Sequence, residues 1–145
     1  MIALLQRVTE ARVTVAGEIT GSIGPGVLAF IGVQPEDDEA SARRLIERIL
    51  GYRIFADETG RMNRALRDVA GGLLLVPQFT LAADTRKGTR ASFTSAAPPT
   101  LGEALFQTCV EFARNQHLLV QTGRFGADMQ VALVNDGPVT FWLEA

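Results

Sequence analysis

The chain has 145 residues, 47% of them hydrophobic and 21% charged, with a formal net charge of −2. This length fits one domain, residues 1–145, with a sizeable core. The near-neutral charge offers a polyanion no global attraction, so a nucleic acid would need a local basic patch. The single cysteine, Cys109, excludes an intramolecular disulfide. No apolar run approaches the ~20 residues that span a bilayer, and no signal-peptide pattern is present, which together predict a cytoplasmic protein without a membrane partner.

The first half of the chain predicts three strands and one helix. In residues 11–23, β-branched residues alternate with other residues on both sides of Gly17, which predicts a hairpin. Residues 24–26 are typical of a turn, and the apolar run 27–33 indicates a strand buried on both faces. A helix follows, with four acids at 36–39 predicting its start and Gly51 its end. Its apolar stripe has helical spacing and consists of Ala42, Leu45, Ile46, Ile49 and Leu50.

The second half predicts further strands and a second amphipathic helix. Residues 52–56 indicate a short strand, 57–60 a turn, and 72–76 a buried strand that runs into 77–81. After a polar loop, 83–99, Thr100 and Glu103 predict a capping box for the helix. Its predicted inner stripe is Leu101, Leu105, Thr108, Cys109 and Phe112. Strands at 129–133 and 139–143 close the chain, which indicates an α+β domain with layered sheets.

The side chains offer few groups for catalysis. Cys109 and the only histidine, His117, lie eight residues apart, roughly 12 Å along a shared helix, so they cannot form a catalytic pair. His117 has a structural explanation, since an imidazole at the end of a helix faces the negative end of the helix dipole. Cys109 lies on the apolar stripe and is explained as a small residue of the core. Zinc or calcium spacing is missing from the sequence. We therefore expect no metal and no cofactor. If the protein is an enzyme, its catalysis must depend on backbone donors, hydroxyls and the substrate itself.

Three further segments have both a functional and a structural interpretation. Residues 77–81 place polar groups at the end of a buried strand, and residues 135–140 place a Gly-Pro pair between two strands. Turn chemistry alone also explains both patterns. The loop with Arg86, Lys87 and Arg90 is the strongest local basic patch, and it is either a nucleic-acid contact or a solvated loop.

These segments together resemble the D-aminoacyl-tRNA deacylase family. The resemblance is carried by Gln6-Arg7-Val8 and by the stretches 50–55, 78–88, 121–125 and 134–142, so it covers nearly the whole chain. It implies a homodimer with a layered β/β/α architecture, a barrel-like core of mostly antiparallel and mixed sheet, and two amphipathic helices. It also implies a D-aminoacyl-tRNA substrate, with glycyl-tRNA accepted as well, and no role for DNA.

The resemblance assigns roles to two motifs. A cis Gly137–Pro138 pair would enter the partner's active site as a chiral filter, with Pro77 and Phe125 also on the substrate-binding side. Gln78, Phe79 and Thr80 would form the catalytic floor. Backbone N–H groups there would stabilise the oxyanion, Gln78 would position the terminal adenosine, and the 2′-hydroxyl of that adenosine would activate the reaction.

One residue departs from the family pattern, and two alternatives follow. The family usually has serine before the glutamine, whereas this chain has Pro77, which lacks both a hydroxyl and a backbone N–H. If that serine were the nucleophile, this protein would be an inactive structural dimer. If backbone groups and the RNA perform the chemistry, which we expect, Pro77 is tolerated. Separately, the basic loop leaves open a non-enzymatic nucleic-acid-binding dimer.

Overall fold

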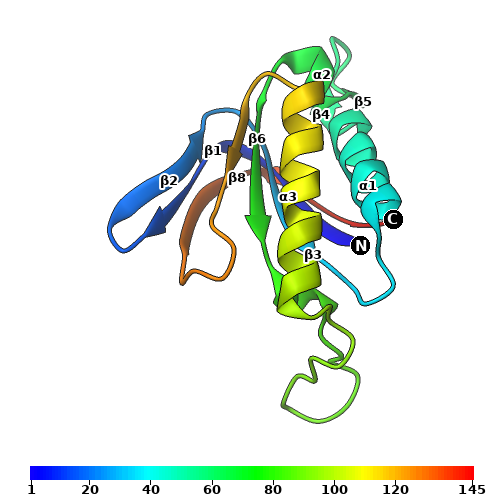
Figure 1. The fold of residues 1–145 in the computed structure, drawn as a ribbon. Helices are drawn as coiled ribbons and strands as arrows, with labels where there is room; N and C mark the ends of the chain where they lie inside the picture. Colours follow the sequence, from blue (N-terminus) through cyan, green and yellow to red (C-terminus); the bar gives the residue numbers. More distant parts are fainter.

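The computed structural model describes residues 1–145 and has the α+β class that the sequence predicts. Six strands form one mixed sheet in the order β2-β1-β3-β6-β7, with β8 also paired to β1. Their bounds are β1 Ile2–Val15, β2 Glu18–Ile23, β3 Gly26–Gly32, β6 Gly72–Pro77, β7 Val120–Thr122 and β8 Gln130–Glu144. The two long helices, α1 (Glu39–Gly51) and α3 (Pro99–Gln116), lie side by side against the sheet (Figure 1).

Strand β1 organises the sheet because it is long enough to pair with three others. It pairs antiparallel with β3 through residues 2–8, with β2 through residues 11–15, and with β8 along most of its length. β2 then curls toward β7. A Cβ atom added to Gly21 would lie 2.6 Å from the carbonyl oxygen of Thr122, so only glycine permits this approach. The sheet is therefore nearly closed and barrel-like.

The parallel pair β3 and β6 forms the floor of the main core, as their apolar runs predict. Every residue of β6 is buried, which is typical of a strand covered on both faces. The predicted stripe of α1 is buried in full, and its Leu45 and Ile46 side chains have no exposed surface. This core holds the helices against one face of the sheet, and a smaller cluster that includes Val13, Leu28 and Leu74 fills the other.

The start of α3 differs from its prediction. The helix begins two residues earlier, at Pro99, with Pro98 as its N-cap and no side-chain cap, so Thr100 and Glu103 form no capping box. Proline at the first helical position is favourable because its missing N–H would have no partner there. The buried face is also rotated: Leu105 and Cys109 are buried as predicted, whereas Leu101, Thr108 and Phe112 are only half-buried. Gly102, Phe106, Val110 and Ala113 complete the buried face.

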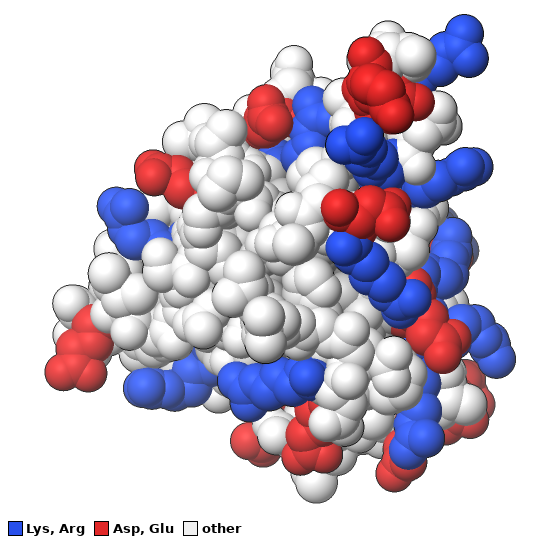
Figure 2. All heavy atoms as spheres, turned by 90° about the horizontal axis from the view of Figure 1, so that it is seen from above, with Lys and Arg blue, Asp and Glu red and all other residues white.

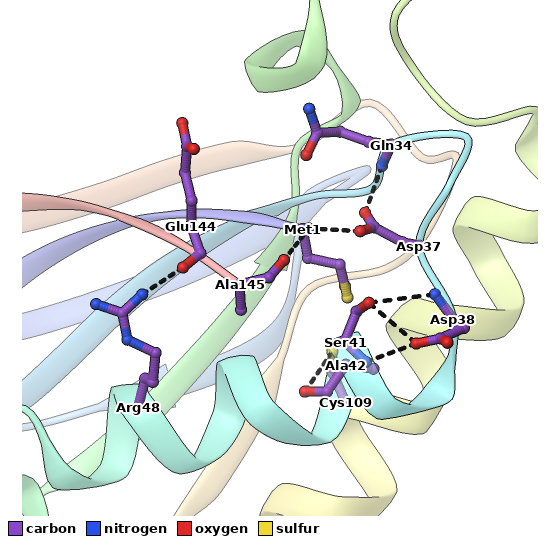
Figure 3. Close-up of polar contacts among 10 residues, drawn as sticks. All are labelled: Met1, Gln34, Asp37, Asp38, Ser41, Ala42, Arg48, Cys109, Glu144 and Ala145. Atoms are coloured by element: carbon purple, nitrogen blue, oxygen red, sulfur yellow. Dashed lines mark hydrogen bonds and ion pairs between the residues drawn. The ribbon is translucent and has the colours of Figure 1, made fainter.

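The acids before α1 have separate tasks. Asp38 is the N-cap and forms a capping box with Ser41, and Glu39 alone lies in the first turn. The carboxylate of Asp37 instead accepts a hydrogen bond from the Met1 ammonium at 2.6 Å and another from the backbone N–H of Gln34 at 2.7 Å (Figure 3). The carbonyl of Ala145 also accepts a hydrogen bond from the Met1 ammonium, at 2.7 Å. The two ends of the chain, next to β1 and β8, are therefore fixed beside α1.

Smaller elements complete the chain. The predicted strand at 52–56 is reduced to β4 (Phe55–Ala56), paired with β5 (Met62–Arg64). A third helix of one turn, α2 (Leu66–Val69), was not predicted, because four residues are too few to show a helical period. No helix is both long and apolar enough to cross a membrane. Seen from above, charged side chains gather mostly on the side of α1, beside a broad area with few charges (Figure 2).

Candidate active site

A cavity of about 330 Å³ opens where β6 ends. Its walls come from the ends of β3 and β6, the first turns of α3 and the segment that precedes β8. It is lined by Ile31, Val33, Pro77, Gln78, Phe79, Ala97, Pro99, Gly102, Phe106, Phe125, Gly126, Ala127 and Met129. None of these side chains ionises. The volume lies at the lower end of the range for small-molecule sites.

A tight turn, η1 (Phe79–Ala82), begins beside this cavity, one residue after β6 ends. Phe79 lines the cavity, whereas Thr80 lies outside its lining. The N–H of Gln78 donates to the carbonyl of Ile31 at 2.8 Å, and Leu81 is the first residue of the turn whose N–H bonds back, to the carbonyl of Gln78. The first N–H groups of such a turn, those of Phe79 and Thr80, have no partner within it. The Gln78 side chain donates to the Thr80 hydroxyl, which fixes both groups relative to each other.

Pro77 is buried at the end of β6 and lines the cavity. Successive residues of a strand direct their backbone groups to opposite sides. The N–H of Gln78 points to β3, whereas the N–H of Leu73 and the carbonyl of Leu75 bond on the β7 side, to Leu119 and Gly123. The ring nitrogen of Pro77 therefore faces the β7 side, beyond the last paired residue of β7. The missing N–H breaks no sheet hydrogen bond.

Phe125 forms part of the opposite wall. Its ring lies 6.5 Å from that of Phe106, and a Cβ atom added to Gly102 of α3 would lie 3.3 Å from the ring. At the start of the same segment, the N–H of Arg124 lies 3.4 Å from the sulfur of Met129. The segment is thus folded back on itself, with Phe125 packed onto the first turns of α3.

Gly137 and Pro138 lie in an exposed bulge of β8, and the peptide bond between them is cis, as the resemblance implies. The predicted pair of strands is one strand. Its pairing with β1 shifts between Gln6, opposite Thr140, and Val8, opposite Asn135, so the intervening residues bulge outward. The Asn135 side chain closes the base of the bulge by donating to the carbonyls of Arg7 (2.9 Å) and Val139 (3.1 Å). A turn was predicted here because a bulge and a turn share the same residue types.

Arg7 supports this bulge and was not assigned a role from the sequence. Its Nε donates to the carbonyl of Asp136 at 3.2 Å and lies 3.4 Å from the Asp136 carboxylate. A second nitrogen donates to the carbonyl of Ile54 at 2.8 Å, which ties the bulge to the segment before β4. The only signal in the sequence was the position of Arg7 in one of the family-like segments. Within one chain, no residue of the bulge lines the cavity beside Gln78.

The three predicted basic contacts are not equivalent. Arg86 donates two hydrogen bonds to Asp84, at 2.9 and 2.7 Å, and these bonds lower the pKa of Asp84 and raise that of Arg86. Lys87 and Arg90 form no ion pair with an acidic residue. All three lie on the loop that projects beyond the start of α3, at the end of the molecule where β6 stops (Figure 1).

Cys109 and His117 lie away from the cavity. Cys109 has no exposed surface, and burial raises the pKa of its thiol to about 12, so the reactive thiolate does not form near neutral pH. His117 caps the far end of α3 and its Nε2 lies 2.6 Å from the carbonyl of Gly71. Gly102, in the cavity wall, is roughly 22 Å away along the helix. The fold gathers no group of three or more potential metal ligands.

The profile of a known family matches residues 4–144, and its description is D-Tyr-tRNA(Tyr) deacylase. The chain belongs to this family. It is 68% identical to a D-aminoacyl-tRNA deacylase of Alkalilimnicola ehrlichii, over 100% of this chain and 97% of the relative. It is 70% identical to a D-aminoacyl-tRNA deacylase of Thioalkalivibrio sulfidiphilus, over 99% of this chain and 97% of the relative.

A solved structure described as a c-Myc DNA unwinding element binding protein has the same fold. The TM-score is 0.95 at 38% sequence identity, and the alignment covers 100% of this chain and 99% of that chain. The family match and this likeness together confirm the fold class expected from the sequence.

Proposed function

We propose that this protein hydrolyses the ester bond between a D-amino acid and the terminal adenosine of tRNA. The observation that carries the proposal is the cavity beside Gln78, in a chain whose family is described as a D-Tyr-tRNA(Tyr) deacylase. Its close relatives bear the name D-aminoacyl-tRNA deacylase. Release of D-amino acids from mischarged tRNA is a chiral proofreading step in translation, which suits a cytoplasmic enzyme.

The catalytic floor is the turn after β6. The N–H groups of Phe79 and Thr80, without a partner inside the turn, are suited to hold the oxygen of the ester carbonyl as negative charge develops on it. Gln78, fixed by Thr80, contacts the adenosine, and Pro77 and Phe125 form walls of its cavity.

Activation of the attacking water falls to the 2′-hydroxyl of the substrate. No ionisable side chain lines the cavity, and the buried thiol of Cys109 and the distant His117 are unsuited to act as base or nucleophile. This arrangement needs neither a metal nor a cofactor.

The chiral filter is the bulge of β8 from a second copy. Gly137 and Pro138 are exposed, and in one chain they lie outside the cavity, so they act in the active site of a partner. A rigid backbone wall rejects an L side chain whatever its chemistry, while glycine, without a side chain, passes. Glycyl-tRNA is therefore a second substrate.

The dimer is supported by exposed apolar side chains on either side of the bulge in β8. Val134 (50% exposed) precedes the bulge and Trp142 (48% exposed) follows it. A partner that receives the bulge covers apolar surface next to it, and burial of that surface stabilises the homodimer. Lys87 and Arg90, and to a lesser extent the paired Arg86, contact the tRNA backbone.

The test is hydrolysis of D-tyrosyl-, L-tyrosyl- and glycyl-tRNA by the purified protein. We expect fast release of D-tyrosine and glycine and near-background release of L-tyrosine. Equal rates for D- and L-tyrosine would contradict the filter, and rates at background for all three would contradict the activity.

Non-enzymatic DNA binding is a second candidate, favoured by the description of the solved structure as a DNA unwinding element binding protein. The net charge of −2 and the short basic loop give this chain little attraction for duplex DNA. A protein that binds DNA tightly at physiological salt but releases no D-tyrosine from tRNA would favour this candidate over the deacylase.

A further inference from the structure

We propose that Phe93, together with Phe79, forms a stacking platform for the nucleotide that precedes the terminal adenosine. The protein would then recognise the single-stranded 3′ end of its RNA and not only the last nucleoside. This inference rests on the proposed function, because it requires an aminoacylated RNA end in the cavity beside Gln78.

The two rings are an exposed aromatic pair. Phe79 is 57% exposed and Phe93 48%, and their ring centroids lie 5.2 Å apart at an interplanar angle of 50°. Single exposed apolar residues are common on protein surfaces and need no explanation. Two rings that contact each other and remain half in solvent form a ready surface for a flat, apolar group. Stacking of one base on such a ring is worth ~1–3 kcal/mol.

The pair lies at the rim of the cavity. Phe79 is part of the cavity lining, whereas Phe93 is not, so the aromatic surface begins inside the cavity and continues outside it. If the terminal adenosine occupies the cavity, the RNA strand leaves it past one of its walls. A strand that leaves along the Phe79 wall brings the preceding base against the pair first.

The segment that carries Phe93 is anchored on both sides. Ser92 exchanges two backbone hydrogen bonds with Asp84, at 2.8 and 3.0 Å. On the other side, the Ser95 hydroxyl donates to the carbonyl of Ala82, and the N–H of Ala97 donates to the carbonyl of Val33 at 2.9 Å. Phe93 is thus presented by an ordered segment, which reduces the entropy lost when a base binds.

Positive charge lies on the same loop. Lys87 and Arg90 have no acidic partner, and together with Asp84, Arg86 and Ser92 they line a shallow pocket. Cations that follow the phosphates next to aromatic rings that take the bases are the combination by which proteins bind single-stranded nucleic acids. The charge complementarity favours RNA over a second protein chain as the occupant of the rings.

The test compares two substrates that differ only in the preceding nucleotides. One is 3′-O-(D-tyrosyl)adenosine, and the other is an RNA hairpin that ends in CCA and carries D-tyrosine. Phe93→Leu retains apolar volume but removes the π-face. We expect its KM for the RNA hairpin to rise about tenfold, with kcat and the kinetics on the adenosine ester unchanged. Phe93→Trp should restore a low KM, and Leu118→Ala, which changes a 94% exposed side chain, is the control.

Each remaining outcome overturns the inference in a recognisable way. Equal losses on both substrates mean that Phe93 supports the cavity and not the RNA. A change in oligomeric mass means that a second copy covers the rings. Unchanged kinetics on both substrates mean that no base stacks there. Failure of the unaltered protein to hydrolyse either substrate would instead contradict the proposed function on which the inference rests.

Discussion

Pro77 shows how a single residue tests the mechanism. It stands where the family usually has serine, and its ring nitrogen faces the side of β6 on which β7 has already ended. The proline therefore fits the sheet without the loss of a ladder hydrogen bond, although proline in a central strand is normally excluded for that reason. Its ring fills part of the cavity wall and offers no nucleophile.

We predict that Pro77→Ser changes kcat for D-tyrosyl-tRNA by less than about fivefold, equivalent to ~1 kcal/mol in the barrier. The reason is that the proposed mechanism assigns the reacting carbonyl to the N–H groups of Phe79 and Thr80, and not to the side chain at position 77. Single-turnover kinetics of both proteins provide the measurement. An increase of several orders of magnitude would mean that a serine hydroxyl takes part directly.

At the scale of one element, β8 combines two tasks along one strand. Its inner side chains, such as Leu143, pack on the core, while residues 136–139 leave the ladder and bulge outward. Arg7 and Asn135 hold the bulge by side-chain hydrogen bonds to backbone carbonyls. This support allows an exposed backbone segment to keep one conformation, which a filter that works by shape requires.

Gly137→Ala should disrupt this bulge locally. Gly137 has a φ of 128°, and an added Cβ atom would lie 2.7 Å from Val139 Cγ2 and 3.0 Å from its nitrogen. Non-glycine residues in such conformations are strained by ~1–3 kcal/mol. We expect at least a tenfold loss of kcat/KM for D-tyrosyl-tRNA, with weaker discrimination against the L-substrate.

The matched control is Gly24→Ala, since a Cβ atom added there has no neighbour within 4 Å. Circular dichroism and thermal unfolding should show both variants folded. A Gly137→Ala protein with the rate and selectivity of the unaltered enzyme would contradict the role of the bulge.

At the scale of the whole molecule, the cavity and the bulge lie apart in one chain. No residue of 135–139 lines the cavity beside Gln78, so one chain does not assemble the full proposed site. The exposed side chains that flank the bulge of β8 offer contacts through which two copies would bring the two parts together. Activity and assembly are therefore expected to depend on each other.

We predict that Val134→Asp yields a folded monomer that has lost most of its hydrolytic activity. A carboxylate at position 134 cannot be buried against a partner without a large desolvation penalty, and Val134 contributes little to the fold because it is half-exposed. Light scattering and the deacylation assay, both at several protein concentrations, make the comparison. Leu118→Asp serves as the control, since Leu118 is 94% exposed and lies outside β8. A monomeric variant with full activity would show that the filter does not come from a partner.

Secondary structure could be predicted from the sequence wherever a segment has one clear hydrophobic period or one unbroken apolar run. This holds for the hairpin around Gly17, the buried strands β3 and β6, and the stripe of α1, because burial of these side chains requires those elements. The resemblance to the family predicted the candidate site residues. The absence of metal-ligand spacing in the sequence indicated that backbone donors would carry the chemistry.

Which of these residues contact one another could not be predicted from local patterns, because it depends on long-range packing. Arg7 and the bulge are more than 120 residues apart in sequence, and their contact depends on the register between β1 and β8. Loop geometry sets the pairing of Arg86 with Asp84 and the contact of Phe79 with Phe93. Loops lack the hydrophobic periodicity from which such contacts could be predicted. Local patterns encode which side of an element is buried, whereas long-range register and loop conformation are set by packing of the whole chain.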